Sequence, residues 1–152
     1  MGKIMQKMLD YAIKDAVYQG FQIFYIGMAQ GFDIIAGEAI LRIKAEGLSE
    51  IKLNCILPFK GQDGKWSKDW RRRHDLILRA ADSIEIINDA YTTGCYHERN
   101  RFLVDNAQRL IVLYSGKQSG TGHTVAYARK KGIEIVNLWE GLDEYRRKNN
   151  KY

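Results

Sequence analysis

The chain has 152 residues, 45% of them hydrophobic and 28% charged, which fits one globular domain and excludes an intrinsically disordered protein. Its net charge of +6 permits an anionic partner without naming one. Two cysteines, Cys55 and Cys95, exclude a disulfide-stapled scaffold, and neither a signal peptide nor an apolar run of membrane-spanning length is evident. We therefore expect a cytoplasmic protein without membrane contact.

The first third of the chain predicts a helix, a strand and a second helix. Apolar residues recur at helical spacing in residues 1–20, and Phe21–Ile26 is an apolar and aromatic run typical of a strand buried on both faces of a parallel sheet. Gly27 and Gly31 separate this strand from a helical pattern that ends at Gly47. Where a glycine turn joins a strand to a helix start, backbone N–H groups and the helix dipole can bind an anion.

The remaining sequence continues to alternate strands with helices. Strands are predicted at 51–57, 83–87, 109–114 and 133–138, and helices at 67–81, 97–107 and 124–131, before a charged helix or tail at 141–152. Ser67 is the expected N-cap of its helix. No repeat or linker interrupts the alternation. It predicts one α/β domain over residues 1–152, a three-layer Rossmann-like domain with a mostly parallel five-stranded sheet.

Candidate ligand residues follow the carboxyl ends of the predicted strands, where open parallel sheets bind ligands. They fall in three groups: Gly27, Met28, Ala29, Gly31 and Asp33 after the first strand; Pro58, Phe59 and the loop to Trp66 after the second; and Ser119–Thr124, with Gly120, Thr121 and Thr124, after the fourth. Two glycine turns that each open a helix suit a ligand with phosphate groups, although the same glycines could serve only as tight turns.

Several polar residues near these strand ends have two interpretations. Asp33 could cap its helix or accept a hydrogen bond from a ribose or an amine. Arg99 and Asn100 lie in the first turn of a predicted helix, where a cation opposes the helix dipole. Arg99 could therefore face an anionic ligand, or a carboxylate such as Asp33 or Glu38. Trp66 could stack on a base or anchor its loop in the core.

The histidines and cysteines give no catalytic or metal-binding pattern. His74 lies on an apolar stripe and Cys55 in an apolar run, so both are interpreted as structural, whereas His123 could contact phosphate. Cys95 and His97 alone are too few ligands for a metal site. Because the sequence also lacks a Walker A loop, GxGxxG, a nucleophile elbow and a catalytic triad, it favours binding over catalysis. No catalytic residue, metal or cofactor is assigned.

Four motifs in this order resemble the YpsA-like branch of the SLOG superfamily, Rossmann-like proteins related to the DNA-processing protein A domain and the LOG phosphoribohydrolases. They are GMAQGFDIIAGEAIL, LPFKGQDGKW, ERNRFLVDNAQRLIVLYSG and SGTGHTVAYARKKG. The resemblance covers nearly all of residues 1–140 and implies a pocket for a nucleotide or nucleotide-derived ligand. By position it implies ligand-facing roles for Gly27, Met28, Ala29, Gly31 and Asp33, for Arg99 and Asn100, for Gly120, Thr121 and Thr124, and for Pro58, Phe59 and Trp66 in an insertion.

The sequence departs from the family pattern in two places. Family members have a central strand, ending in a Gly-His-Arg type motif, before the first helix; here the sequence starts with that helix. This predicts a gap in the sheet that another segment or subunit would fill, and makes a homodimer attractive. LOG enzymes carry a glutamate after the second glycine turn, where this chain has Thr124-Val125-Ala126-Tyr127, so the LOG-type hydrolysis is not expected.

Three functional hypotheses follow. The leading one is a sensor or sequestering module that binds a nucleotide-derived small molecule. The second is a hydrolase or transferase acting on an N-glycosidic or phosphate bond of such a molecule, with Asp33 or Glu38 as acid or base. The third is nucleic-acid binding, motivated by the net charge of +6 and by the resemblance to the DNA-processing domain. It ranks last because the basic residues are not gathered with aromatics in one loop.

Overall fold

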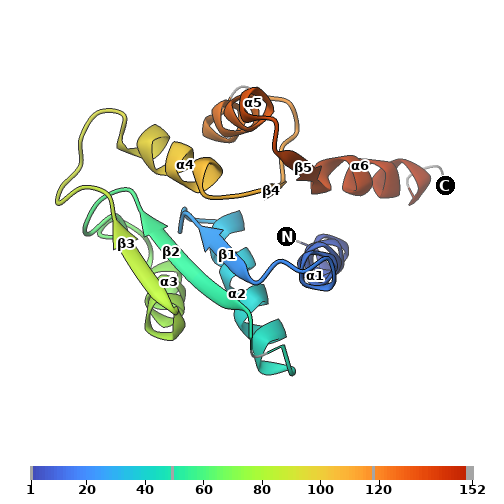
Figure 1. Cartoon of the computed structure of the whole chain (residues 1–152), viewed down its shortest axis with the longest axis horizontal. Coiled ribbons are helices and arrows are strands. Elements are labelled where there is room, and N and C mark those ends of the chain that lie inside the picture. The colour runs from blue at the N-terminus through green and yellow to red at the C-terminus, as the bar shows by residue number, and fades with distance from the viewer. Residues whose placement is uncertain (1, 49, 118, 150–152) are drawn as a thin grey trace.

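The structure is a computed structural model that describes residues 2–48, 50–117 and 119–149. Strands and helices alternate along the chain (Figure 1), and this confirms the expected α/β class. The elements are α1 (Lys3–Tyr18), β1 (Ile23–Ile26), α2 (Phe32–Ala45), β2 (Lys52–Leu57), α3 (Lys68–Ala80), β3 (Ser83–Ile86), α4 (Cys95–Asp105), β4 (Arg109–Val112), α5 (Gly120–Lys131), β5 (Glu134–Asn137) and α6 (Leu138–Asn149).

The five strands are divided between two parallel sheets, which corrects the expectation of one five-stranded sheet. One sheet has the order β1-β2-β3 and the other pairs β4 with β5. Ile23 lies opposite Lys52, Asn54 opposite Ser83, and Arg109 opposite Glu134. Within the described ranges, β1 and β4 each pair on one side, so each leaves one hydrogen-bonding edge without a strand. The gap that the family resemblance predicts beside the first strand is present.

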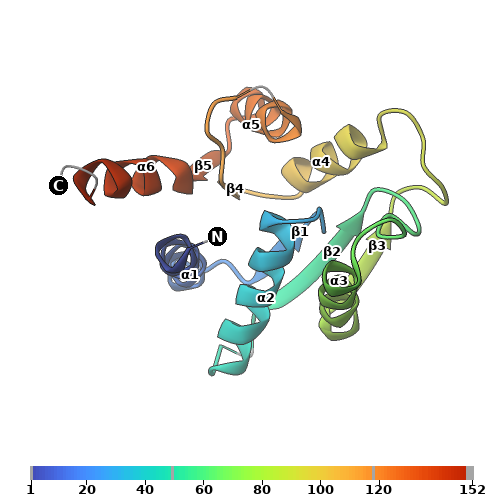
Figure 2. The ribbon, with the colours of Figure 1, turned by 180° about the vertical axis from the view of Figure 1, so that it is seen from behind.

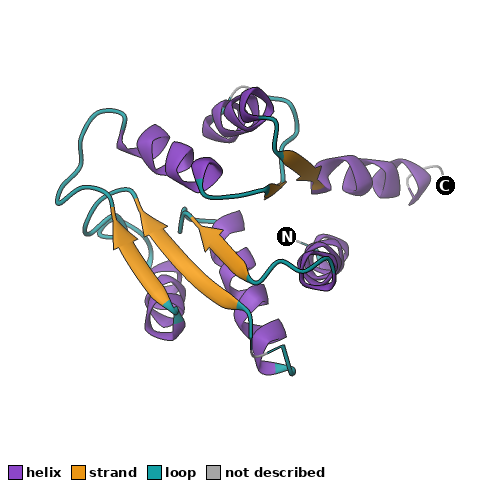
Figure 3. Ribbon diagram, viewed as in Figure 1, coloured by secondary structure: helices purple, strands orange, loops and turns teal. Residues whose placement is uncertain are grey.

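Helices lie on both sides of the strands and give the expected layers. Figures 1 and 2 show α2 and α3 against one face of β1–β3, with α1 beside α2, and α4 and α5 on the other side. Figure 3 shows the strands between these two groups of helices. The main core joins Leu9 and Ile13 of α1 to Ile34 and Ile43 of α2 and Leu53 of β2, each no more than 1% exposed. Burying each such side chain contributes about 1.5–3 kcal/mol, so α1 and α2 are strongly held to this face.

The start of α5 differs from the prediction because its first turn is capped earlier. The helix begins at Gly120, whereas the sequence predicts Thr124. The hydroxyl of Ser119 accepts a hydrogen bond from the N–H of Gly122 at 3.2 Å, a typical N-cap. Most of the second glycine turn is therefore the first turn of a helix.

Two further helices, α4 and α6, also begin earlier in the chain than the sequence predicts. The helix α4 begins at Cys95, two residues before the predicted start, directly after Gly94, whose φ of 82° favours glycine. The last helix begins at Leu138, immediately after β5, and takes in the residue at which the last strand was expected to end. Residues 150–152 of the expected tail lie outside the described residues.

Two other local expectations are confirmed, the N-cap at Ser67 and the burial of Cys55. The Ser67 side chain caps α3 by accepting a hydrogen bond from the N–H of Trp70 at 3.5 Å. Cys55 is fully buried, and this burial raises the pKa of its thiol to about 12. In the described part of the chain, no group of three or more His, Cys, Asp or Glu side chains is arranged to hold a metal ion. None of the described helices combines the length and apolar character needed to cross a membrane.

Candidate functional site

A cavity of about 1080 Å³ lies between β1 and β4. Its polar part, here called the mouth, is formed where β1 and β4 end and where α2, α4 and α5 begin. The mouth is lined by Gly27, Ala29, Asp33, Tyr96, His97, Arg99, Asn100, Ser119, Gly120, Thr121, His123 and Thr124. Eight of the predicted ligand residues line it: Gly27, Ala29, Asp33, Arg99, Asn100, Gly120, Thr121 and Thr124.

Arg99 is a buried cation at the centre of the mouth. Its side chain comes from the second turn of α4, and only 5% of the residue is exposed. Nη1 donates to the carbonyl oxygen of Gly27 at 2.5 Å, and Nε donates to Oδ1 of Asn100 at 2.8 Å. Loss of hydration lowers the pKa of Arg99, although the nearby Asp33 opposes this shift. Among the described residues, no carboxylate oxygen lies within the 4.0 Å of an ion pair with Arg99.

Gly27 allows Arg99 to approach the end of β1. A Cβ atom at position 27 would lie 2.7 Å from Cδ and 2.9 Å from Nε of Arg99, closer than a real Cβ contact. The φ angle of Gly27 is not in the left-handed region, so backbone conformation does not require glycine there. Position 27 needs glycine because Arg99 occupies the space of a Cβ atom. Gly27, which the sequence predicts as a residue of a phosphate-binding turn, thus leaves the space in which the Arg99 side chain lies.

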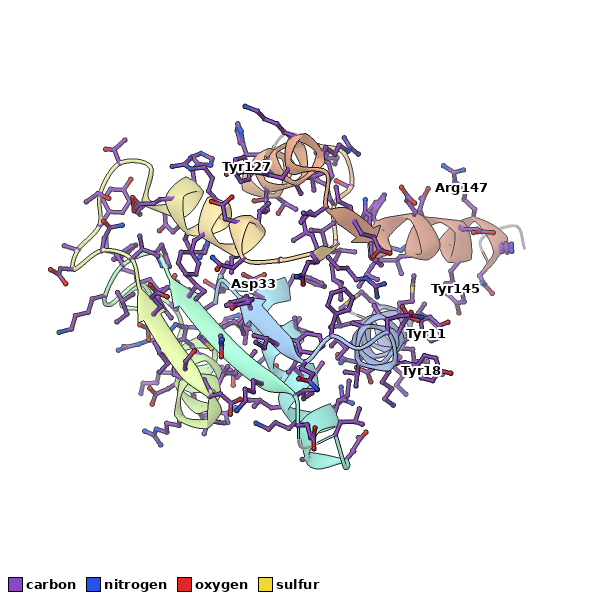
Figure 4. The ribbon with its side chains drawn as sticks, viewed as in Figure 1. Tyr11, Tyr18, Asp33, Tyr127, Tyr145 and Arg147 are labelled. Atoms are coloured by element: carbon purple, nitrogen blue, oxygen red, sulfur yellow. The ribbon has the colours of Figure 1, made fainter. Side chains whose placement is uncertain are left out.

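Asp33 stands beside Arg99 at the start of α2. Figure 4 labels it between β1 and α4, and its Oδ2 accepts a hydrogen bond from the N–H of Ala29 at 3.2 Å. Burial raises the pKa of Asp33, although Arg99 and the N–H groups of Ala29 and Gly27 favour its charged form. The carboxyl group therefore organises the turn after β1 and also faces the cavity.

The first turn of α5 forms the opposite wall of the mouth. Gly120 and Thr121 bring N–H groups that a helix leaves unpaired at its start, together with the positive end of the helix dipole. Thr124 donates from Oγ1 to the carbonyl of Gly120 at 3.2 Å. The rings of His97 and His123 are 4.7 Å apart and join α4 to α5 at this wall.

Three aromatic rings stand next to the mouth. Phe59 lies 5.6 Å from Tyr91 and 6.1 Å from Tyr96, and the two tyrosines are 6.2 Å apart. Tyr96 lines the cavity and its ring lies 5.9 Å from the guanidinium carbon of Arg99. Tyr91 is 60% exposed and Tyr96 47%, so the cluster presents aromatic surface to solvent. Sequence reasoning singled out Phe59 but missed the tyrosines, of which Tyr91 lies in the polar loop after β3 and Tyr96 in the first turn of α4.

Glu38 does not face Arg99. It accepts hydrogen bonds from Arg73 at 2.6 and 2.9 Å, and Arg73 also lies 4.3 Å from the ring of Trp70. This contact joins α2 to α3 on the side away from the cavity. Of the two carboxylates considered for Arg99, Asp33 alone lines the mouth.

The other predicted residues support the mouth without lining it. Met28 is fully buried, and its carbonyl accepts from Nε2 of Gln62 at 2.9 Å. Gly31 has a φ of 102° and precedes α2. The carbonyl of Pro58 accepts from Nδ2 of Asn88 at 3.1 Å. Trp66 is partly buried and contacts the core, which favours its interpretation as a loop anchor.

His74 links the loop after β2 to the glycine turn after β1. It is 2% exposed, and Trp66 packs edge-on against it with ring centroids 5.1 Å apart. Its Nε2 lies 3.1 Å from the Gln62 Nε2 that donates to Met28. Because an amide nitrogen only donates, we assign Nε2 of His74 as the acceptor of a neutral imidazole. Burial lowers the pKa of His74, against the raising effect of Asp63, and favours this neutral form.

The amino-acid sequence is similar to one protein family and to several individual bacterial proteins. The sequence profile of the YspA SLOG family matches residues 2–135. A UPF0398 protein of Shouchella clausii is 25% identical over 119 residues, covering 77% of this chain and 63% of that protein. A UPF0398 protein of Halalkalibacterium halodurans is 27% identical over 119 residues, covering 77% and 62%. The uncharacterized SPbeta prophage-derived protein YoqJ of Bacillus subtilis is 31% identical over 121 residues, covering 70% and 69%.

The match therefore spans somewhat less than two thirds of the first two relatives. Among solved structures, (E)-4-hydroxy-3-methyl-but-2-enyl diphosphate reductase matches with a TM-score of 0.25 at 12% identity, covering 88% of this chain and 52% of that one. This similarity is too low to support an argument. The match of the profile to nearly the whole chain shows that this protein belongs to the YspA SLOG family.

Proposed function

We propose that the mouth binds a nucleotide or nucleotide-derived small molecule, and that the protein serves as a sensor or sequestering module for it. The observation that carries the proposal is Arg99, a buried cation that faces a cavity and has no carboxylate at ion-pair distance in the described residues. A buried charge is costly unless it is paired, and an anionic ligand would supply the pair. Membership of the SLOG family agrees with a nucleotide-related role.

The mouth offers separate surfaces for the parts of a nucleotide. A phosphate between Arg99 and Gly120 would accept from the guanidinium and from the N–H groups that open α5. A base would then reach the aromatic cluster, because Tyr96 borders both Arg99 and the exposed ring of Tyr91. Stacking of a base on an aromatic ring contributes about 1–3 kcal/mol to binding, and it accepts different bases because each has a π-face.

Titration calorimetry with ATP, ADP, NAD, ADP-ribose and cyclic dinucleotides tests the proposal. Changing Arg99→Gln should weaken binding of the best ligand by about 10- to 100-fold, because a charge-assisted hydrogen bond contributes roughly 1.5–3 kcal/mol. Arg101→Gln is the matched control, since Arg101 has the same charge on the same helix but is exposed. Failure of the whole panel to bind, or equal losses in the two variants, would contradict the proposal.

A second candidate is catalysis on the same ligand, and Asp33 is the observation that favours it. Its carboxyl group lines the cavity and burial raises its pKa, as is needed for a general acid. If the protein is an enzyme, incubation with the panel should release products, and Asp33→Asn should abolish turnover while binding is retained. If the wild-type protein leaves every ligand of the panel unchanged, catalysis is contradicted and binding stays the proposed function.

A further inference from the structure

The turn after β1 contains a residue in an uncommon backbone conformation. Met28 has a φ of 60°, and among the described residues it is the one residue other than glycine with a positive φ. Residues with a Cβ atom avoid this left-handed region because Cβ approaches the following carbonyl oxygen. Met28 is fully buried, whereas its neighbour Ala29 lines the cavity. Such a conformation persists only where the surrounding groups fix it.

Two hydrogen bonds fix the peptide group that joins Met28 to Ala29. Its carbonyl accepts from Nε2 of Gln62 at 2.9 Å, and its N–H donates to Oδ2 of Asp33 at 3.2 Å. Figures 1 and 2 show the loop between β2 and α3, which carries Gln62, at the same end of the sheet as the end of β1. Gln62 does not line the cavity, so it reaches the mouth only through this peptide group.

The same turn places both charged side chains of the mouth. Asp33 is bonded to the N–H of Ala29, and Arg99 is bonded to the carbonyl of Gly27, directly before Met28. A rotation of the peptide group after Met28 would turn the N–H of Ala29 away from Asp33. The position of the carboxylate beside Arg99 therefore depends on what holds this peptide group in place.

His74 sets the direction in which Gln62 donates. The amide nitrogen that donates to Met28 also lies 3.1 Å from Nε2 of His74. An amide nitrogen carries two hydrogens, so it serves both partners only while Nε2 is an acceptor. If Nε2 carried a proton, Gln62 could accept it only by turning its oxygen round, and this oxygen would then face the carbonyl oxygen of Met28. Neutral His74 therefore keeps Gln62 turned towards the turn.

The surroundings of His74 favour this neutral form. Asp63 of the loop has Oδ2 at 3.7 Å from Nδ1, which favours the tautomer with its proton on Nδ1, and Asp63 is shared with Arg71 at 3.8 Å. Asp63 and Asp75, on α3 itself, act to raise the pKa of His74, and no charged group of α2, which packs against α3, is among its influences. Burial outweighs both carboxylates and lowers the pKa.

We propose that Gln62 is a positioning residue of the ligand site, which neutral His74 directs and which holds the turn after β1 so that Asp33 and Arg99 meet the ligand. This inference rests on the proposed function for the identity of the ligand as a nucleotide. The hold on the turn itself is a property of the free protein, so the two can be tested separately.

Hydrogen exchange of the free protein, read by NMR, tests the hold on the turn. Gln62→Met keeps the length of the side chain but removes the donor, and it should speed exchange of the Ala29 amide about tenfold or more, because the peptide group loses one of its two anchors. The amide of Ile40, in the middle of α2, should keep its rate and show that the fold is intact. Gln19→Met, at an exposed position after α1, is the matched control and should change neither rate.

Calorimetry with ADP as the probe tests the effect on the ligand site. Gln62→Met should lower ADP affinity about 3- to 10-fold, as expected for the loss of one neutral hydrogen bond, and Gln19→Met should not. His74→Gln keeps an acceptor close to the position of Nε2 but takes up no proton. It should bind ADP like the wild type at pH 7.5.

The pH profile of ADP binding separates positioning from a merely structural role. The pKa of His74 is lowered from 6.5, so the wild type should lose affinity relative to His74→Gln only below about pH 6.5. Asp33, His97 and His123 are present in both proteins, so the difference between the two profiles reports His74.

Unchanged exchange of the Ala29 amide in Gln62→Met, or parallel pH profiles for the wild type and His74→Gln, would overturn the proposal. If ADP binds to none of the proteins, the nucleotide fails as a ligand and the exchange rates alone decide whether Gln62 holds the turn. If ADP binds equally to all of them, the positioning role fails and nucleotide binding at the mouth stands.

Discussion

At the scale of single residues, the contact between Gly27 and Arg99 decides the shape of the mouth. Changing Gly27→Ala would push the arginine away, because the added Cβ would lie 2.7 Å from its Cδ. We expect ligand affinity to fall by about tenfold or more, similar to the effect of Arg99→Gln. Calorimetry of both single variants and the double variant checks this. A double variant no weaker than Arg99→Gln alone shows that Gly27 acts through the arginine, whereas additive losses would contradict it.

His74 gives the fold a pH dependence of predictable sign. Its folded-state pKa lies below the ordinary value of 6.5, chiefly through burial, so below that pH the unfolded chain binds the proton more readily. Stability should therefore fall as the pH drops from about 6.5 towards the lowered pKa of the folded state. Protonation would also turn Nε2 into a second donor facing Gln62 and release the turn at Met28.

Urea unfolding at pH 7.5, 6.5 and 5.5 measures this dependence. The wild-type midpoint should decrease with acidification, and His74→Gln should flatten the decrease between pH 6.5 and 5.5. His97→Gln, at an exposed position, is the control and should keep the wild-type slope. An unchanged slope in His74→Gln would show that the pH dependence has another source.

Sequence reasoning offered Asp33 as a carboxylate for Arg99 because a cation in the first turn of a helix opposes the helix dipole. Both residues line the mouth, although α4 begins at Cys95 and so places Arg99 in the second turn. The same reasoning failed for Glu38 because five residues at about 3.6 per turn place it roughly 140° around the helix from Asp33. It missed Tyr91 and Tyr96 because their contacts with Phe59 join residues more than 30 positions apart in the sequence, which no local pattern reveals.

At the scale of elements, α2 packs closely against β1 and α3 at Gly37. A Cβ there would lie 2.8 Å from Cδ1 of Ile26 in β1 and 3.1 Å from Cδ1 of Ile77 in α3. Alanine favours a helix by about 1 kcal/mol over glycine, but overpacking costs about 1–3 kcal/mol. Gly37→Ala should therefore lower stability by about 1 kcal/mol in a denaturant titration.

Gly141 of α6 provides the comparison for this substitution. Its near neighbours are atoms at the flexible end of Met8, which can move. Gly141→Ala should leave stability unchanged or raise it slightly through helix propensity. A rise in stability for Gly37→Ala, or equal losses for the two variants, would show that the packing of α2 is looser than described.

Element types could be predicted because each strand and helix has its own hydrophobic period, whereas their ends depend on caps. Ser119 starts α5 early because its hydroxyl satisfies the N–H of Gly122, and glycine costs little in a first turn whose N–H groups are unpaired anyway. A glycine-rich segment therefore looks like a loop in the sequence although it folds as a helix start.

At the scale of the whole molecule, the pairing of the strands could not be predicted from the hydrophobic pattern. The hydrophobic pattern locates strands one at a time, but pairing joins residues distant in sequence, and among the described residues β4 pairs only with β5. The expectation of a gap beside the first strand came from the family resemblance and not from the pattern. The edges of β1 and β4 that border this gap line the same cavity as the mouth.

The net charge is distributed in a way that weakens the case for nucleic-acid binding. Arg71, Arg72 and Arg73 lie 3.8, 3.0 and 2.6 Å from the carboxylates of Asp63, Asp69 and Glu38 respectively. These pairs neutralise the basic run locally, whereas binding to nucleic acid draws on cations that can meet phosphates. Nucleic-acid binding stays a prediction, and the buried Arg99 remains the stronger indication of an anionic partner.

Under the proposed function, Arg99 holds a phosphorylated, nucleotide-derived ligand in the mouth. Mass spectrometry of small molecules released by denaturing the purified protein tests it most directly, with the wild type, Arg99→Gln and Arg101→Gln prepared side by side. We expect the wild type and Arg101→Gln to release a compound containing phosphate and a base, and Arg99→Gln to release much less of it. Release of the same compound in equal amounts from all three proteins, or of a compound without phosphate, would contradict it.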